Sequence, residues 1–536
     1  MGCSATYVSY RDTGYFPDLV LDYIDGAESV KPYYHLPPNP AGIAENIRLR
    51  KENPTNREQL VKHLLRQYEK VERAELSEKQ ILSLKDPNTF TVTTAHQPNL
   101  FTGPLYLIYK IIHAIRLSRE LKQEFPDHHF VPVYYMGNED ADFDELSHCR
   151  VMGERYTWST DQRGAFGKLK VDDALLSIIT QLNSLLPVYP HGAEIIKLLK
   201  NSYTKERSIE EATFDLLHRL FADYGLIILI ADSKELKSQF VSVVKDELQN
   251  SISQKIVSKT IESLESKYAV QTGVREINLF YLIDGKRERI ERSEKDWIVL
   301  NTSLRFTEES LLNELEQYPE RFSPNVILRP LYQELLLPNI AFVGGAGELS
   351  YWLELKELFQ HYQIPFPVLI LRQSLLLTKE QVEKKITQMG FEVNDFFKPA
   401  AQLLNEYVKK HSNLHTDLDD ELQSLRDLYK QIEIKAAKAD KSLMQHTGAL
   451  CLQAEKKLDA LSKKMQRAER RRFSDEQRRI QKIKDELFPG GSLQERIDSI
   501  WTFYAISGKT ILDDILNYTD PFNLSSISII FSNADS

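Results

Sequence analysis

Apolar and polar positions between residues 90 and 148 are arranged as in a parallel α/β unit. Phe90–Thr94 is a β-branched run that predicts a buried strand. After a polar stretch, apolar residues recur at helical spacing from Leu105 to Leu121, and Pro104 suits the first turn of that helix. A second apolar run, Phe130–Met136, ends abruptly in acidic residues. The pattern predicts strand, helix and strand with a polar turn after each strand, and in such units ligands bind at the carboxyl ends of the strands.

The same alternation of strands and helices extends to about residue 380. The amphipathic helix predicted at Ala212–Tyr224 is followed by a buried strand at Leu226–Ile230. Glu348–His361 has the spacing of a further helix. Three more strands are predicted, at Val326–Arg329, Ile340–Gly345 and Phe366–Leu371. Strands that alternate with helices over this length predict a doubly wound α/β core across residues 1–380.

Two stretches interrupt the core pattern. Residues of about 150–210 predict short strands and helices that leave the main sheet and return near Ile209. Residues of about 265–320 contain alternating positions around Asp284-Gly285, which is a hairpin signal. We therefore expect two insertions in the core.

Beyond residue 380 the pattern becomes that of a coiled coil. Apolar residues follow 4-3 spacing from Leu418 to Leu443, and after a turn predicted at His446–Gly448 a second helix resumes the seam and ends at Leu487. Residues 381–491 are therefore predicted to hold an antiparallel coiled-coil hairpin. Residues 492–536 predict one more helix and an apolar strand, Ile527–Phe531, in a segment that returns to the core.

Composition narrows the classes of protein that this chain can belong to. A net charge of −9 and a pI near 5.9 argue against binding to nucleic acid through global charge. Three widely spaced cysteines argue against a disulfide framework and for a reducing compartment. No apolar run approaches the length of a membrane span, and no signal-peptide pattern is present. We expect a cytoplasmic protein that binds neither membrane nor nucleic acid.

The first polar turn, Ala95–Pro104, leads from a predicted strand into a helix N-terminus. Free backbone N–H groups and the helix dipole favour an anion at such a place. His96 adds a group that titrates near neutrality. The turn lacks the lysine and the glycine spacing of a Walker loop. It is either a binding turn or a structural connection between strand and helix.

The second polar turn gathers five carboxylates and an imidazole within ten residues: Glu139, Asp140, Asp142, Asp144, Glu145 and His148. Such a cluster can bind a divalent cation, orient a substrate amine or act as a general base. The alternative is a capped, solvated start of a helix, because acidic residues favour first turns.

The third turn, Gly344–Glu348, is rich in glycine and allows a ligand to approach the backbone closely. Tyr351 and Trp352 follow within one helical turn of it. Glycine-rich turns also serve plain packing. Arg329 and Arg372 stand at the ends of predicted strands, where each can neutralise a carboxylate or phosphate or take part in a structural ion pair.

In their order along the chain, several motifs resemble those of the bacillithiol biosynthesis cysteine-adding enzymes, the BshC family. The motifs that carry the resemblance are Asp12–Phe16, Leu21–Tyr23, His96-Gln97, Leu100–Tyr106, Tyr109-Lys110, Glu139-Asp140, Asp142-Phe143, His148, Arg329–Glu334, Gly344–Glu348, Tyr351-Trp352, Leu487–Arg496 and Phe503-Tyr504. The resemblance covers nearly the whole chain. Many members carry Gln-Gln in place of His96-Gln97, which directs attention to Gln97 before His96.

The resemblance implies a Rossmann-like core with two connecting-peptide insertions, similar to class I aminoacyl-tRNA synthetases, and a helical coiled coil through which two copies associate. It also implies a ligase that joins the carboxyl group of L-cysteine to the amine of glucosaminyl-malate, the last step to bacillithiol. No metal or cofactor is assigned. Because amide formation from a free carboxylate is uphill in water, ATP or another nucleotide is a reasonable cosubstrate, although the HIGH and KMSKS signatures of the synthetases are absent.

We take Glu139, Asp140 and Asp142 as candidate catalytic residues, which bind sugar hydroxyls or take a proton from the attacking amine. Arg329 or Arg372 would hold the malyl carboxylates. The full set of candidate substrate-binding residues is His96, Gln97, Asn99, Phe101, Thr102, Gly103, Tyr106, Arg329, Gly344, Gly345, Glu348, Tyr351, Trp352 and Arg372. The alternative function is a non-catalytic Rossmann-like nucleotide-binding scaffold that dimerises through its coiled coil.

Overall fold

The computed structural model describes residues 5–72, 74–270, 273–283, 285–412, 418–523 and 526–532. The chain forms two compact units. The larger combines Met1–Lys379 with Ser492–Ser536, and the smaller is Glu380–Gly491.

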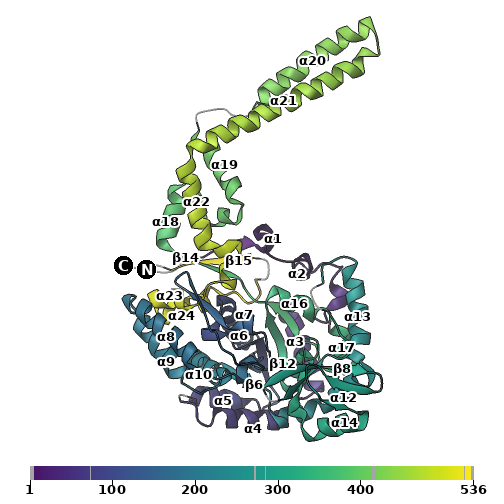
Figure 1. Ribbon diagram of the computed structural model, residues 1–536, viewed down its shortest axis with the longest axis vertical. Helices are drawn as coiled ribbons and strands as arrows, with labels where there is room; N and C mark the ends of the chain where they lie inside the picture. Colours follow the sequence, from purple (N-terminus) through teal and green to yellow (C-terminus); the bar gives the residue numbers. More distant parts are fainter. Residues whose placement is uncertain are drawn as a thin grey trace. The chain divides into compact units, whose positions relative to one another are not determined.

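A five-stranded parallel sheet is the centre of the larger unit (Figure 1). Its order is β13-β12-β2-β3-β6. The strands in chain order are β2 (Thr89–His96), β3 (His129–Met136), β6 (Ile227–Ile230), β12 (Asn339–Gly344) and β13 (Val368–Leu371). The chain places β3 and β6 on one side of β2 and then crosses to the other side for β12 and β13. The topological switch point therefore lies between β2 and β12, where ligands of doubly wound sheets bind.

Helices cover this sheet, and its strands are buried almost throughout. α6 (Leu105–Glu124) packs on β2 and β3, and α3 (Pro40–Glu52) packs on β12 and β13. The predicted doubly wound α/β core is thus confirmed. In the part of the chain that the structure describes, every helix is too short or too polar to cross a membrane.

The two stretches that interrupt the core pattern carry additional elements. The first contains the hairpin of β4 (His148–Val151) and β5 (Glu154–Thr157), followed by α8 (Asp173–Leu185) and α9 (Gly192–Ser202). The second contains a separate five-stranded sheet of order β10-β9-β8-β7-β11. These strands are β7 (Leu279–Ile283), β8 (Lys286–Ser293), β9 (Asp296–Val299), β10 (Arg305–Phe306) and β11 (Phe322–Pro324). Asp284, at the predicted hairpin turn, lies outside the described residues.

The strand predicted at Val326–Arg329 is wrong. β11 ends at Pro324, and α15 (Arg329–Leu336) begins at Arg329. The Asn325 side chain accepts a hydrogen bond from the backbone N–H of Ile327 at 2.9 Å, which turns the chain. Pro330 stands in the first turn of α15, where its missing N–H costs nothing.

The helix predicted at Glu348–His361 is two helices, α16 (Ala346–Trp352) and α17 (Lys356–His361). Apolar residues at Leu349, Trp352, Leu355 and Phe359 are buried on both sides of the break. The apolar spacing continues across the break, which is why the sequence predicts one helix.

The C-terminal segment of the larger unit contains two helices where one was predicted, α23 (Trp501–Ser507) and α24 (Thr510–Tyr518). The apolar run at its end forms β15 (Ser526–Ser532). β15 pairs with β1 (Ala5–Ser9) and β14 (Leu375–Lys379) in a three-stranded sheet, and not with the central parallel sheet.

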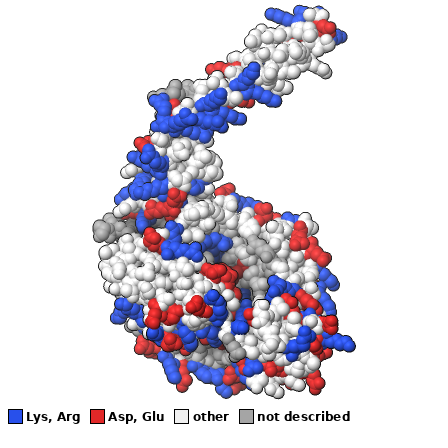
Figure 2. All heavy atoms as spheres, viewed as in Figure 1, with Lys and Arg blue, Asp and Glu red and all other residues white. Residues whose placement is uncertain are grey.

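The smaller unit contains the long antiparallel pair of α20 (Asp419–Ala439) and α21 (Leu443–Arg472), so the predicted coiled coil is confirmed. The turn lies at residues 440–442 and not at His446–Gly448. Asp440 accepts a hydrogen bond from Ser442 N–H at 2.8 Å there, whereas Gly448 is inside α21. Figure 2 shows Lys and Arg side chains gathered over α21 and α22 (Ser474–Leu487).

Candidate active site

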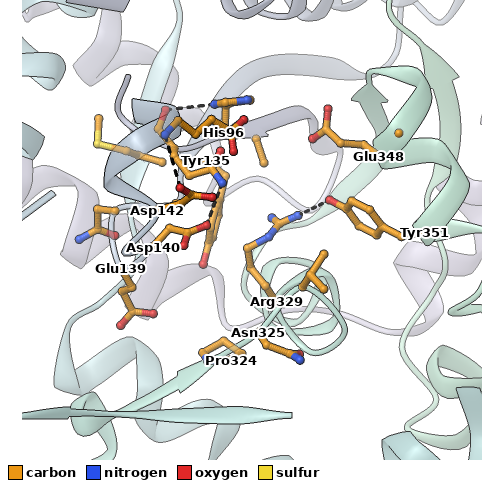
Figure 3. A pocket seen from close by; sticks show the side chains of 18 of the residues that line it. His96, Tyr135, Glu139, Asp140, Asp142, Pro324, Asn325, Arg329, Glu348 and Tyr351 are labelled. Atoms are coloured by element: carbon orange, nitrogen blue, oxygen red, sulfur yellow. Dashed lines mark hydrogen bonds between the residues drawn. The ribbon is translucent and has the colours of Figure 1, made fainter. Parts of the chain in front are cut away.

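A cavity of about 890 Å³ lies where the strands of the central sheet end. Every strand of that sheet supplies lining residues at or just beyond its carboxyl end. These are His96 at the end of β2, Gly137–Asp140 after β3, Ala231 and Asp232 after β6, Gly345 after β12, and Arg372 after β13. Both predicted polar turns and the glycine-rich turn therefore meet in one place. Figure 3 shows Glu139, Asp140 and Asp142 on one side, Glu348 and Tyr351 on the other, and Arg329 between them.

The first polar turn contributes His96 and Gln97 to the cavity wall, and Tyr106 in the first turn of α6 lines it as well. Gln97 Nε2 donates a hydrogen bond to Asp140 Oδ2 at 2.8 Å, which joins the first turn to the acidic one. Burial and, to a smaller extent, the Lys110 ammonium lower the pKa of His96 to about 3. The imidazole is therefore neutral at physiological pH and serves as a hydrogen-bonding group, not as a titrating one.

The other four predicted residues of the first turn, Asn99, Phe101, Thr102 and Gly103, do not line the cavity. They are packed behind it. Phe101 is fully buried, and its carbonyl accepts a hydrogen bond from Trp501 Nε1 at 2.8 Å. Gly103 has a φ of 61°, and a Cβ there would lie 2.5 Å from the Asn99 side chain. These residues fix the path of the turn and do not present groups to a ligand.

The members of the acidic turn are held differently from one another. Glu139 accepts hydrogen bonds from Lys237 Nζ at 2.7 Å and from Ser323 Oγ at 3.0 Å, so its carboxylate is committed to the protein. Asp142 caps the short helix α7 (Phe143–Leu146). Asp140 Oδ2 accepts the hydrogen bond from Gln97, and Oδ1 accepts one from the Ala141 N–H at 2.7 Å and lies 3.6 Å from the Arg287 guanidinium. All three predicted catalytic residues line the cavity, and Asp140 is the one whose side chain is bound by the first polar turn.

Glu145 also lines the cavity, although it was not among the predicted site residues. Within the described chain no side chain donates a hydrogen bond to its carboxylate. Partial burial raises the pKa of Glu145, and the neighbouring Asp142 and Asp140 raise it further. A carboxylate of raised pKa is a better proton acceptor than an ion-paired one. His148 is not part of the cavity lining.

On the opposite wall, Gly345, Glu348 and Tyr351 line the cavity, whereas Gly344 and Trp352 do not. Trp352 is fully buried, and its ring stacks on Phe342 at a centroid distance of 4.5 Å. A Cβ on Gly344 would lie 2.8 Å from both Leu349 Cδ1 and Phe342 Cε1, so a larger residue would have to displace these buried side chains. The glycine-rich turn and the helix that follows it therefore contribute fewer residues to the cavity wall than the motif Gly344–Glu348 with Tyr351-Trp352 contains.

The two candidate arginines have different partners. Arg372 is buried, and its guanidinium donates two hydrogen bonds to the Glu495 carboxylate, at 2.6 and 2.8 Å. Arg329 is partly buried and donates to neutral oxygens, Tyr351 Oη at 2.9 Å and Gln333 Oε1 at 3.2 Å. No carboxylate of the described residues forms an ion pair with Arg329. Arg329 is thus free to take an anion in a way that Arg372 is not.

Asp232, at the end of β6, belongs to a network on the cavity rim. Asn138 Nδ2 donates to Asp232 at 2.9 Å and to Glu210 at 2.5 Å, and the Lys168 ammonium contacts both carboxylates. Burial and Asp232 raise the pKa of Glu210 to about 7. The Lys168 ammonium thus lies between the carboxylates of Glu210 and Asp232. Among the described residues, no group of three or more His, Cys, Asp and Glu side chains is arranged to hold a metal ion.

Several lining residues come from parts of the chain that sequence patterns did not connect with the site. Arg287 reaches the cavity from β8 and lies over the Phe280 ring at 3.8 Å. Lys110 comes from the second turn of α6, and Arg496 comes from the C-terminal segment. Lys110 and Arg496 are within motifs that carry the family resemblance. In the sequence, only that resemblance connects these two residues with the cavity. Nothing in the local pattern around Arg287 points to the site.

Comparison with known proteins gives two family matches that together span nearly all of the chain. The family described as "Bacillithiol biosynthesis BshC, N-terminal Rossmann-like domain" matches residues 3–373. The family described as "Bacillithiol biosynthesis BshC, C-terminal coiled-coil domain" matches residues 375–531. The chain belongs to the BshC family. The predicted family is therefore confirmed.

Relatives of similar length support the same family. A protein of Flavobacterium johnsoniae named "Putative cysteine ligase BshC" is 38% identical over 519 residues, which cover 96% of this chain and 98% of that protein. One of the same name from Flavobacterium psychrophilum is 37% identical and covers 96% and 97%. These relatives confirm the prediction of an enzyme of the ligase class.

A crystal structure from Campylobacter jejuni, described as a "putative arginyl t-RNA synthetase", covers 85% of this chain and 98% of its own at 11% identity. Its TM-score is 0.22, which is too low to indicate a shared fold.

Proposed function

We propose that this BshC-family protein joins the carboxyl group of L-cysteine to the amine of glucosaminyl-malate, which completes bacillithiol. The carboxylate carbon of cysteine forms an amide bond with the sugar nitrogen, and one water is lost. Three widely spaced cysteines fit a reducing cytoplasmic setting, in which a thiol product is stable.

The observation that carries the proposal is the arrangement of opposite charges across one cavity. Arg329 presents a guanidinium without a carboxylate partner among the described residues, as a malyl carboxylate requires. Asp140 presents a carboxylate on the other side, as an amine requires, and Glu145 of the same acidic turn also lines the cavity. Glucosaminyl-malate carries both carboxylates and an amine, and cysteine also carries a carboxylate and an amine.

Within this cavity, the acidic turn would bind the sugar and accept the proton of its amine. Asp140 is oriented by Gln97, and Glu145 stands beside it with a raised pKa. Glu139 and Asp142 hold the turn in shape through Lys237 and the cap of α7. The neutral His96 and the Tyr106 ring would form the wall against which the smaller substrate packs.

The carboxyl group must be activated, because amide formation from a free carboxylate is uphill in water. We expect an activating cosubstrate such as ATP, which an assay must therefore supply.

We also propose that two copies associate through the coiled coil. α20 and α21 expose large apolar side chains, among them Leu428, Ile434 and Leu452. Exposed apolar residues on paired helices are typical of an interface. Light scattering should give twice the chain mass for the wild type, and a Leu428→Lys/Leu452→Lys variant should give the mass of a single chain. A wild type of single-chain mass at micromolar concentration would contradict this proposal.

Bacillithiol content in a deletion strain tests the catalytic proposal against a scaffold role. The wild-type chain should restore bacillithiol, and an Asp140→Asn variant of equal abundance should not. A matched control, Asp420→Asn on the exposed start of α20, should restore it fully. Restoration by Asp140→Asn to the wild-type level would reduce the acidic turn to a structural role.

A further inference from the structure

The carboxylate of Glu348 has one oxygen engaged by the protein and one that is not. Its Oε2 accepts a hydrogen bond from Gly345 N–H at 2.9 Å and forms an ion pair with the Lys110 ammonium. Within the described residues no donor reaches Oε1. Glu348 lines the cavity, on the side opposite the acidic turn (Figure 3).

Lys110 holds this carboxylate in place. The lysine is only 3% exposed, and its Nζ also donates to the Ala95 carbonyl at 3.1 Å. The ammonium is thus tied to the end of β2 while it contacts a residue of α16. Burial raises the pKa of Glu348, but Lys110, His96 and the Gly345 N–H together outweigh burial, and the pKa lies below its usual range. The carboxylate is therefore fixed both in position and in charge.

An ionised carboxylate with a free oxygen in a sheltered cavity is suited to a cation, and both substrates of the proposed reaction contain an amine. The two amines have opposite requirements. The sugar amine attacks a carbonyl and must lose its proton, whereas the α-amine of cysteine must stay protonated so that it does not react. A firmly ionised carboxylate is a weak proton acceptor and stabilises an ammonium. Glu348 therefore suits the amine that stays protonated.

We propose that Glu348 Oε1 binds the α-ammonium group of the cysteine substrate, and that Lys110 is the positioning residue that holds the Glu348 carboxylate toward it. This inference rests on the proposed function. It places cysteine at the wall formed by β2, α6 and α16, and so leaves Arg329 and the acidic turn to glucosaminyl-malate.

The test compares cysteine with 3-mercaptopropionate, which is cysteine without its α-amine. For the wild type, kcat/KM should favour cysteine by about 10- to 100-fold, the usual effect of a charge-assisted hydrogen bond. A Glu348→Gln variant keeps the shape of the side chain and removes its charge. It should raise the KM for cysteine by about the same factor, leave the KM for glucosaminyl-malate unchanged and lose most of the preference for cysteine. Glu357→Gln, the same change at an exposed position of α17, should match the wild type.

Two further variants separate binding from folding. Glu348→Asp retains the charge and should retain a preference for cysteine, with weaker binding. Lys110→Met should raise the KM for cysteine, and Lys110→Met combined with Glu348→Gln should be no worse than Glu348→Gln alone, because both changes remove one interaction.

The inference is overturned if Glu348→Gln keeps the wild-type preference for cysteine over 3-mercaptopropionate, or if it raises the KM for glucosaminyl-malate instead. The second result would assign Glu348 to the sugar amine. A wild type that makes no product from cysteine and glucosaminyl-malate would instead contradict the proposed function itself.

Discussion

Replacing each of the two arginines of the cavity wall with methionine should separate a binding group from a structural one. Arg372→Met removes the partner of Glu495, whose side chain is 2% exposed. The buried carboxylate would keep only the hydrogen bond from Ser374 Oγ at 2.6 Å among the contacts described for it. Breaking a buried ion pair in this way costs about 3–5 kcal/mol of unfolding free energy.

Arg329→Met removes no ion pair among the described residues. The guanidinium donates to two neutral oxygens, on Tyr351 and Gln333, and the loss of such bonds costs about 1 kcal/mol each. Removal of a charged donor from a substrate carboxylate costs about 1.5–3 kcal/mol, which is roughly a 10- to 150-fold rise in the KM for glucosaminyl-malate. Arg329→Met should therefore lose about 2 kcal/mol of unfolding free energy, less than Arg372→Met, and should bind glucosaminyl-malate poorly.

Urea unfolding and steady-state kinetics of both variants measure these two effects. Arg372→Met should have the lower unfolding free energy by about 1–3 kcal/mol, from the difference between the two costs given above. Arg329→Met should have the higher KM for glucosaminyl-malate at an unchanged KM for cysteine. If Arg329→Met instead lost as much stability as Arg372→Met and bound glucosaminyl-malate normally, Arg329 would be a structural residue and the proposed orientation of the substrate would be wrong.

Three other substitutions test the packing and electrostatics of the cavity wall. Gly103→Ala should lower the unfolding free energy by more than about 1 kcal/mol, because the new Cβ would clash with the Asn99 side chain and the positive φ favours glycine. A urea midpoint equal to that of the wild type would contradict this prediction. Glu139→Gln should lower the unfolding free energy by about 3 kcal/mol because it leaves the buried Lys237 ammonium without its carboxylate partner. If the variant instead kept the wild-type unfolding free energy and lost turnover, Glu139 would be a catalytic residue. His96→Gln should change the pH dependence of stability. The folded-state pKa of His96, about 3, lies below its ordinary value of 6.5, so the wild type loses stability as pH falls from 6.5 toward 3 and the variant should lose less. Parallel stability curves for wild type and variant over that interval, from denaturation at each pH, would show that the imidazole is not kept neutral by the fold.

Much of the core could be predicted from the sequence because its signals are local. A parallel strand buried on both faces is a continuous apolar run, as in β3 and β13, and the polar turn that follows marks the edge of the sheet. The placing of Gln97, Asp140 and Gly345 around one cavity followed from that rule, since carboxyl ends of neighbouring parallel strands meet.

The residues that could not be predicted depend on contacts between distant segments. The sequence contains no sign that Arg372 is neutralised by Glu495, which lies 123 residues away. Likewise, nothing local shows that Glu139 is held by Lys237 whereas Asp140 is held by Gln97. Asn99 and Thr102 are polar residues in a turn, and only the packed structure shows that they are buried behind the wall. The sequence therefore indicated which turns line the cavity, and tertiary packing decided which members of each motif reach it.

The most direct measurement is product formation by the purified chain. The protein is supplied with L-cysteine, glucosaminyl-malate, magnesium and ATP, and thiol products are identified by mass spectrometry, with parallel reactions that omit one substrate or replace ATP with another nucleotide. The proposed function predicts a product equal in mass to the two substrates less one water, formed only when both are present and lost in Asp140→Asn. A folded wild-type protein that forms no such product under any of these conditions, or a product that persists at the wild-type rate in Asp140→Asn, would contradict it.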